Sequence, residues 1–483
     1  MPRSDRRLCS PWPTMGNGMN SEDVRLCAGR VFGMNVSLIA RTQAALRSGL
    51  LTGIALGVSP SVCAQEAAGD LELSGSVRVR YEAYDNTFRG SGARTDDALT
   101  IRTSIAAKYT RGRFRVGGEI RDSRGYAIDL DTPINSAHID PLQVPQLYVG
   151  MDVSDQVSVT AGRMVLNFGS KRLVGDPGWR NAANAFTGLR LDWQGPEGQE
   201  RLSVFYTLPD KRHPDTKGEI IANAWSVDTE GFDLRFWGAF ASAQRGPVAL
   251  EAYGFLLDER DDATHATRNR HLRTFGGRLQ VPRAGRWDFE LEAALQLGRI
   301  RTSRADGAPR VPVRAYMAHA EAGYALPGSL DARLSLQADM ASGDKGGTSR
   351  HERFDSLYGP RRGDWGPTSL YGPLGYSNVR SLGVRAEIAP SKRFDAFVDW
   401  RRVWLDSRDD TFAFTGIRDA SGASGRDGGS QLQARVRYWL ISKRIRIDLG
   451  AAWLDKGAFL KRAPNVQDRG DTHYGYGDIY FLF

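Results

Sequence analysis

The sequence predicts an all-β protein, a transmembrane antiparallel β-barrel of about 18 strands with long extracellular loops. Three observations lead to this class. Segments of about ten residues alternate apolar and polar side chains along most of the chain, as barrel strands do. Short and long connections alternate between these segments, and a short uncharged apolar stretch precedes the first of them.

The composition excludes several other classes. The chain has 483 residues, 41% hydrophobic and 25% charged, and its negative mean hydropathy argues against a bundle of membrane-spanning helices. Its three cysteines, Cys9, Cys27 and Cys63, all precede the body, which leaves no basis for a disulfide framework or a cysteine-ligated metal. The 65 basic and 56 acidic residues give a net charge of only +9, without a nucleic-acid-binding motif. We therefore expect no cofactor, no metal and no nucleic-acid partner.

The N-terminal region has the pattern of a secretory signal peptide. Arg41 and Arg47 precede an uncharged stretch at 48–65 with an apolar core at 50–58, and small or modest side chains favour cleavage after Ala64. A membrane anchor fits less well, because an apolar core of about ten residues is too short to cross about 30 Å of hydrocarbon.

Residues 1–33 resemble no targeting segment, whereas Met34 is a plausible start. We therefore interpret 1–33 as a start-site extension, 34–64 as the signal peptide and 65–483 as the barrel. The exported chain would then reside in the outer membrane of a Gram-negative cell.

The body carries the period-two pattern in almost every segment. In the first segment Leu73, Val77 and Val79 lie on one face, whereas Arg78 and Arg80 lie on the other. Strands with one apolar and one strongly polar face suit a barrel with lipid outside and water inside. The predicted strands are 71–82, 99–110, 114–121, 146–153, 156–166, 187–194, 200–208, 232–241, 247–258, 272–281, 286–298, 313–326, 329–340, 379–389, 393–405, 431–440, 443–454 and 475–483.

Two further arguments favour a membrane barrel over a soluble sandwich. A sandwich needs a second layer and less charge on its outward faces, whereas a closed barrel satisfies every backbone hydrogen bond in lipid. The last segment alternates Ile479, Phe481 and Phe483, and a terminal aromatic residue resembles the signal read by the outer-membrane assembly machinery. We therefore expect that machinery and the lipid bilayer as partners.

The alternation assigns many charged side chains to the lumen, with bases in excess of acids. Arg78, Arg80 and Arg102 are among the bases, and Arg235 and Arg401 follow in later strands. Rings of arginine select anions, because guanidinium groups replace the hydration of carboxylate or phosphate. The alternative is that ion pairs across the interior fill and brace a large barrel.

Two segments carry a more specific signal. Residues 162–192 contain Gly-Arg-Met-Val, Arg-Leu-Val-Gly, Trp-Arg-Asn and Phe-Thr-Gly-Leu-Arg-Leu-Asp, and residues 341–358 contain Ala-Ser-Gly-Asp and Arg-Phe-Asp-Ser-Leu-Tyr. This series resembles the signature of the alginate export outer-membrane porin family. Met164 stands where that family usually has Gln, and Thr187 stands where Asp is common, so the local hydrogen bonding differs.

The resemblance implies a monomeric barrel whose electropositive pore passes an anionic polysaccharide, such as a uronate polymer. Asp192 either separates successive carboxylates or orients its neighbouring arginine, and Trp179 fits a packing role better than a sugar platform. Arg163 falls on the apolar face of its strand, so a pore role requires a bulge there, and otherwise it is an interfacial arginine. The candidate pore residues that follow from the motifs are Arg163, Arg172, Arg180, Arg190, Asp192 and Arg353, continued by Arg361 and Arg362.

The leading hypothesis is export of an anionic polysaccharide through this pore, as part of a complex with a periplasmic secretion scaffold. The alternative is an uptake channel or a general anion-preferring porin for acidic oligosaccharides, because the fold does not fix the direction of transport. An outer-membrane enzyme fits least. No Gly-x-Ser-x-Gly occurs, and only His319, beside Glu321, lies well inside a predicted strand.

Overall fold

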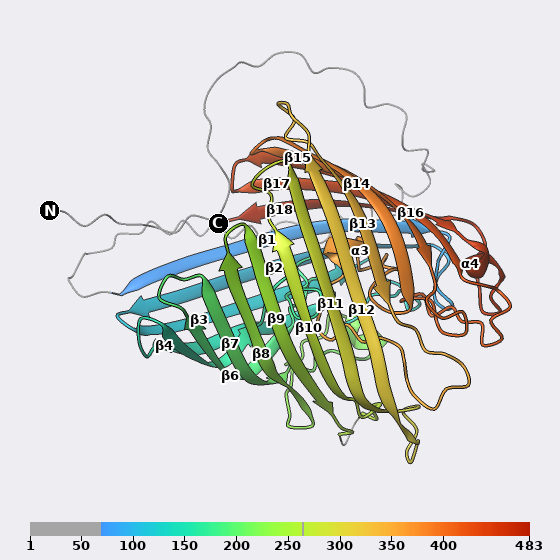
Figure 1. Cartoon of the computed structure of the whole chain (residues 1–483), viewed down its shortest axis with the longest axis horizontal. Helices are drawn as coiled ribbons and strands as arrows, with labels where there is room; N and C mark the ends of the chain where they lie inside the picture. Colours follow the sequence, from blue (N-terminus) through green and yellow to red (C-terminus); the bar gives the residue numbers. More distant parts are fainter. Residues whose placement is uncertain (1–68, 263–264) are drawn as a thin grey trace. The chain divides into compact units, whose positions relative to one another are not determined.

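The computed structural model describes residues 69–262 and 265–483, so the predicted start-site extension and signal peptide lie outside the described part. It shows one closed antiparallel barrel of 18 strands, which confirms the predicted fold class (Figure 1). Strands adjacent in sequence pair throughout, and β1 closes the sheet by pairing with β18. The strands are β1 (Asp70–Asp85), β2 (Asp96–Arg111), β3 (Phe114–Tyr126), β4 (Asp140–Asp152), β5 (Val157–Val165), β6 (Ala185–Gln194), β7 (Glu200–Pro209), β8 (Leu234–Arg245), β9 (Val248–Glu259), β10 (His271–Val281), β11 (Trp287–Arg301), β12 (Arg310–Ala325), β13 (Arg333–Ala341), β14 (Val379–Ser391), β15 (Phe394–Trp404), β16 (Asp427–Ile441), β17 (Ile445–Lys456) and β18 (Thr472–Leu482).

The two faces of the sheet differ as the alternation predicts. Ile105, Leu189 and Leu291 on the outer face are more than half exposed (57%, 59% and 54%), whereas Arg80 and Asp399 on the inner face are buried. Lipid covers the outer face of a membrane barrel, which accounts for these exposed apolar side chains without a second protein layer.

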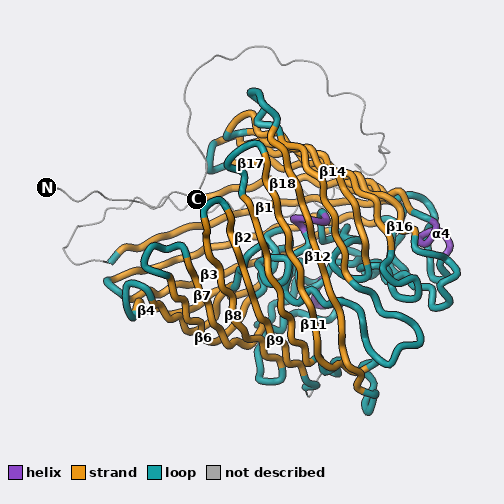
Figure 2. The backbone as a smooth tube through the Cα atoms, in the orientation of Figure 1, coloured by secondary structure: helices purple, strands orange, loops and turns teal. Residues whose placement is uncertain are grey.

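The strand connections alternate in length. The turns at 112–113, 246–247 and 392–393 lie at one end of the barrel, which we call the short-turn end. The connections at the opposite end, the long-loop end, are longer, and 342–378 is the longest of them (Figure 2). Long loops of this kind face the outside of the cell in outer-membrane barrels.

Three short helices lie within the long loops: α2 (Lys217–Ile221), α3 (Arg362–Trp365) and α4 (Ala458–Arg462). Among the described residues, no helix combines the length and apolar character needed to cross a membrane. Two long loops, 166–184 and 342–378, contact the inner face of the barrel, and we call them the inner loops. The fold therefore brings loop side chains into the lumen, where they meet side chains of the strands.

Part of the lumen wall is aromatic and not polar. Phe205 of β7, Phe236 of β8 and Phe255 of β9 are buried there. Phe168 of the first inner loop stacks on Phe205 and Phe255, with ring centroids 5.2 and 5.8 Å apart. This aromatic wall holds one end of the first inner loop against the barrel.

The aromatic wall overturns one expectation. Because Phe236 faces inward, its neighbour Arg235 lies on the outer face, where it pairs with Asp258 of the adjacent strand. The prediction that Arg235 faces the lumen was wrong. The apolar residues of this strand cover a loop inside the barrel, so the rule that polar residues face the lumen fails here.

Candidate functional site

The first inner loop, 166–184, crosses the lumen and is held at two walls. Arg78 of β1 donates hydrogen bonds of 3.0 and 2.9 Å to two backbone carbonyl oxygens of this loop. Arg172 of the same loop forms ion pairs with two glutamates of β11. The loop therefore bridges β1 and β11 inside the barrel.

The second inner loop, 342–378, is anchored on other strands. The hydroxyl of Tyr376 donates a 2.8 Å hydrogen bond to Asp339 of β13, and the hydroxyl of Tyr371 donates one of 2.8 Å to Gln431 of β16. Both tyrosines are buried. Together the inner loops occupy part of the lumen between these strands.

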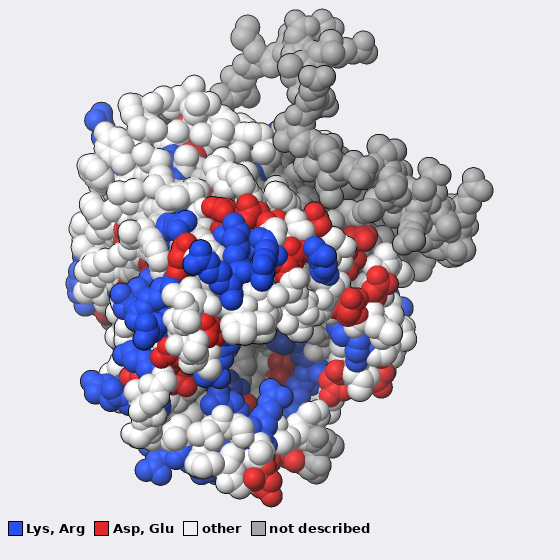
Figure 3. Space-filling model, turned by 90° about the vertical axis from the view of Figure 1, so that its right-hand side faces the viewer, with Lys and Arg blue, Asp and Glu red and all other residues white. Residues whose placement is uncertain are grey.

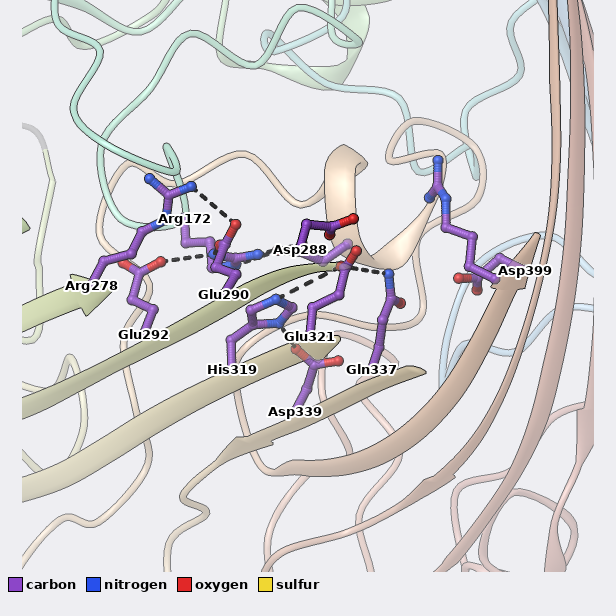
Figure 4. Close-up of polar contacts among 12 residues, drawn as sticks. Arg172, Arg278, Asp288, Glu290, Glu292, His319, Glu321, Gln337, Asp339 and Asp399 are labelled. Atoms are coloured by element: carbon purple, nitrogen blue, oxygen red, sulfur yellow. Dashed lines mark hydrogen bonds and ion pairs between the residues drawn. The ribbon is translucent and has the colours of Figure 1, made fainter. Parts of the chain in front are cut away.

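Arg172 joins the two inner loops to the wall. Its Nε lies 2.9 Å from Asp364 Oδ2 in α3. Its Nη1 lies 2.8 Å from Glu292 Oε2 and also contacts Glu290 (Figure 4). Burial alone would raise the pKa of Asp364, but the Arg172 guanidinium lowers that pKa to about 2. We call these four residues the arginine clamp.

The clamp belongs to a network of ion pairs on the inner faces of β9 to β16, which we call the paired wall, and Figure 4 shows part of it. Every arginine of this network contacts at least one carboxylate, so its charge is compensated within the protein. On this side of the lumen the bracing interpretation of the sequence describes the structure. The ion pairs outside the clamp are Arg278 with Glu251 and Glu290, Arg333 with Asp288, Glu321 and Glu387, Arg385 with Glu387, Arg401 with Asp339 and Asp399, and Arg435 and Arg437 with Asp395.

Three other arginines lack such compensation in the described part of the chain. They are Arg89, Arg180 and Arg361, which we call the inner arginine cluster. They come from three long loops, and within the described ranges none of the three forms an ion pair with a carboxylate. Arg361 donates to the carbonyl oxygens of Gly372 and Leu374 at 3.0 and 3.2 Å, so its partners are neutral.

Two charges of this cluster act on the third, Arg361. Burial lowers the pKa of Arg361 well below its usual value, and the guanidinium groups of Arg180 and Arg89 lower it further. Burial also lowers the pKa of Arg180 and of Arg89 to about 10. All three side chains are only half-buried. The cluster is therefore an accessible site that favours an anion.

Of three predicted arginines in β1 and β2, one is paired with a described carboxylate and two are not. Arg80 of β1 forms a bidentate ion pair with Asp478 of β18, at 2.5 and 2.7 Å. Arg78 is buried against neutral partners, including the hydroxyl of Tyr480 at 3.0 Å. Arg102 of β2 has neither a hydrogen bond nor an ion pair with any described residue, and its Nε is buried. Arg78 and Arg102 thus add uncompensated positive charge to the lumen side of β1 and β2.

The other predicted residues have separate places. The register pairs Arg163 with Leu147, which is 63% exposed, so Arg163 lies on the outer face and contacts Glu230 there without a bulge in that ladder. This placement corrects the pore role expected for Arg163. The strand keeps its regular alternation, so Arg163 takes the alternative role, that of an interfacial arginine.

Arg190 and Asp192 form a pair on β6, 2.8 Å apart, so Asp192 orients this arginine. Arg353 pairs with Asp410 at 3.1 Å and donates to backbone carbonyl oxygens of loop 405–426, so it fastens two loops together. The side chain of Arg362, the first residue of α3, lies outside the described part of the structure.

The long-loop end is hollowed, and Lys and Arg side chains gather around the hollow (Figure 3). A cavity of about 540 Å³ lies among the long loops there, lined by Arg268, Arg270 and Arg353 and by the ring of Phe414. The guanidinium of Arg361 lies 3.9 Å from the centroid of the Phe414 ring. The mouth cavity therefore leads to the inner arginine cluster across one aromatic side chain.

Sequence reasoning missed Arg89 and the loop partners of Arg172, whereas the alternation already places Glu290 and Glu292 on the lumen face. Arg89 lies in the loop 86–95, where no alternation indicates which side chains face inward. Asp364 and Tyr376 were missed for the same reason, because they lie in the second inner loop. A loop rich in buried aromatic residues, such as Trp365 and Tyr371, was the available signal that this segment fills the lumen.

Trp179 is buried as a packing residue, with Arg80 stacked 3.4 Å from its ring centroid. His319 faces the lumen as expected, with Nδ1 2.6 Å from Asp339 and Nε2 4.0 Å from Glu321. Its Nε2 has no hydrogen-bond partner among the described residues, so no hydroxyl nucleophile is aligned with it.

The sequence matches the family model for alginate export over residues 70–470. The chain belongs to the alginate export family. Its resemblance to that family, inferred from the two motif segments, is thereby confirmed. No curated protein matches the chain in sequence.

Solved structures of outer-membrane proteins from Pseudomonas aeruginosa share the fold. The outer membrane protein OpdK superposes with a TM-score of 0.57 at 14% identity, covering 86% of this chain and 98% of its own. OccK2 (OpdF) has a TM-score of 0.54 at 14% identity, with the same coverage. OpdK with vanillate has a TM-score of 0.54 at 13% identity, covering 85% of this chain and 98% of its own. Family and fold together are those of an outer-membrane channel.

Proposed function

We propose that this channel passes an anionic polysaccharide or oligosaccharide of the uronate type, in the direction of export. The observation that carries the proposal is the inner arginine cluster, where Arg89, Arg180 and Arg361 come together and, among the described residues, none forms an ion pair with a carboxylate. We also propose that the barrel acts as a monomer and that a periplasmic scaffold docks at its short-turn end.

The cluster is unfavourable without an anion, because like charges in a partly desolvated site repel one another. A sugar carboxylate that enters this cluster removes this repulsion and accepts bidentate hydrogen bonds from a guanidinium. The arginines are half-buried and not enclosed, so each contact remains weak enough to release. A polymer with one carboxylate per sugar can therefore move from one arginine to the next.

A second candidate is uptake of acidic oligosaccharides or small carboxylates. The observation that favours it is the pair of inner loops, which cross the lumen and narrow it. OpdK, whose fold this chain shares, has been crystallised with vanillate, a small aromatic carboxylate.

The test is ion selectivity in planar bilayers, measured as a reversal potential under a salt gradient and followed by titration with oligouronates. We expect an anion-selective channel that oligouronates block. The double variant Arg180→Gln, Arg361→Gln should lose most of the selectivity and the block, whereas Arg385→Gln in the paired wall should retain both. This control removes the same kind of charge from a position that a carboxylate already compensates.

Cation selectivity, or a block that both variants retain equally, contradicts the proposal. The two candidates separate by ligand size. Permeation of long oligouronates added at the short-turn side supports export, whereas permeation restricted to monomers and vanillate supports uptake.

A further inference from the structure

The outer face of the barrel carries a group of arginines that the channel function does not use. Arg273 of β10, Arg299 of β11 and Arg314 of β12 are exposed. In the described part of the chain their side chains have no ion pair and no hydrogen bond. We call these three residues the outer arginine group.

The register shows that the three residues are neighbours. Leu297 of β11 stands opposite Arg273 on one side and opposite Arg314 on the other. Arg299 lies two residues further along β11, on the same face. Since adjacent strands are about 4.8 Å apart, the three guanidinium groups can reach one ligand.

Their height on the barrel is defined by the rows beside them. The adjacent row towards the short-turn end consists of Phe275, Leu295 and Tyr316, which are 50%, 42% and 39% exposed. Such a row of apolar and aromatic side chains marks the boundary of the lipid-facing band. The outer arginine group therefore lies at the lipid boundary of the long-loop end.

The acids near this group are already engaged. Asp258 is the nearest one along the outward row, and it contacts Arg235, His271 and Arg260. The surface therefore keeps an uncompensated positive charge next to the apolar band. A lipid with an anionic headgroup fits this surface, because the headgroup can pair with the arginines while the acyl chains contact the apolar band.

A largely apolar groove lies beyond the row of Phe275, Leu295 and Tyr316 and extends from β10 to β15, with Arg380 also in its lining. It has a volume of about 960 Å³ and is lined by Gly277, Ala293 and Ala318, together with larger apolar side chains such as Leu291 and Trp404. Gly277 lies four residues from Arg273 on β10, a distance of about 13 Å along a strand. An acyl chain attached to a headgroup at the arginines reaches this groove.

We propose that the outer arginine group binds the phosphates of an acylated, phosphorylated glycolipid of the outward leaflet, with acyl chain seated in the groove. Arginine forks match phosphate oxygens bidentately, and basic pockets at the membrane boundary bind phosphorylated headgroups in this way. The lipid would occupy one fixed side of the barrel, next to β10, β11 and β12.

The test uses the whole protein in an uncharged detergent and counts retained lipid by native mass spectrometry. The probes are bisphosphorylated lipid A, monophosphorylated lipid A, phosphatidylethanolamine and inorganic phosphate. We expect retention to decrease in the order bisphosphorylated, monophosphorylated, phosphatidylethanolamine. The variant Arg273→Gln, Arg299→Gln, Arg314→Gln should bind lipid A about a hundredfold more weakly, about fivefold for each arginine.

The matched control is Arg111→Gln, Arg393→Gln, Arg444→Gln, which removes three exposed arginines at the short-turn end and should bind lipid A as the parent does. A second variant, Ala318→Trp, fills the groove and should weaken retention of lipid A but not of its deacylated headgroup. Equal retention by the two triple variants would overturn the proposal. Displacement of the lipid by millimolar inorganic phosphate would also overturn it, because it would reveal a free-anion site.

Discussion

The lumen contains two groups of arginines, one paired with carboxylates and one without such partners among the described residues. In the paired wall every arginine is held by at least one carboxylate, and Arg401 lies between Asp339 and Asp399. In the inner arginine cluster Arg361 has only carbonyl oxygens and an aromatic ring as partners. The same residue type therefore braces the barrel on one side and offers a site to an anion on the other. Counting lumen arginines does not distinguish the two.

The largest effect should follow from breaking the paired wall at its centre. Arg172→Ala leaves Glu292 and Asp364 without their ion-pair partner and leaves Glu290 with Arg278 alone, and loss of one partner of a buried ion pair costs about 3–5 kcal/mol. We expect a lower thermal unfolding midpoint and cleavage of the second inner loop by added protease. A variant as stable and protease-resistant as the parent would show that the clamp contributes little. Arg190→Ala serves as a control for loss of an arginine elsewhere.

Acid should weaken the same clamp without a mutation. The pKa of Asp364 is about 2 in the folded protein, below its ordinary value of 3.8. Ionised Asp364 therefore stabilises the folded state fully above about pH 4. This stabilisation, about 2 kcal/mol, is lost as the pH falls towards 2. Fluorescence of Trp365 against pH should report this release, and Asp364→Asn should remove the transition. An unchanged titration in that variant would assign the transition to another group.

A smaller effect on stability, with a clear effect on selectivity, is expected for Arg89→Gln in the inner arginine cluster. The change removes a partly buried charge that acts against Arg361, together with one 2.7 Å hydrogen bond to the carbonyl oxygen of Leu370. The two contributions offset each other, so the free energy of unfolding should change by less than about 1 kcal/mol. The reversal potential should nevertheless move towards that of a non-selective pore. A large loss of stability would place Arg89 with the bracing residues.

The smallest effect should come from Arg190→Gln. Its guanidinium pairs with Asp192 and lies partly exposed, so the pair contributes less than about 1 kcal/mol and little positive field. Conductance and selectivity should remain close to those of the parent. If selectivity falls as far as it does in Arg361→Gln, the distinction between compensated and uncompensated arginines does not govern permeation.

The strands of this barrel were predictable, because a buried polar face and a lipid-facing apolar face repeat with the period of the strand itself. The same alternation already indicated that Arg163 faces outward. It failed at Arg235, where a loop inside the barrel requires an aromatic wall. It says nothing about Arg89 or Asp364, because loop residues have no fixed period. The inner loops are made of such residues, so sequence motifs located Arg172, Arg180 and Arg361 without indicating which of them are compensated.

The contact between Arg80 and Asp478 joins the first strand to the last, and the second inner loop extends across this join. Ser369 of that loop contacts Glu82 on β1, while Tyr371 contacts Gln431 on β16. These anchor points come from opposite ends of the chain, and they meet only after the cylinder has closed. We therefore expect the second inner loop to settle after the barrel has closed, so that a newly inserted molecule is more permeable before this step than after it.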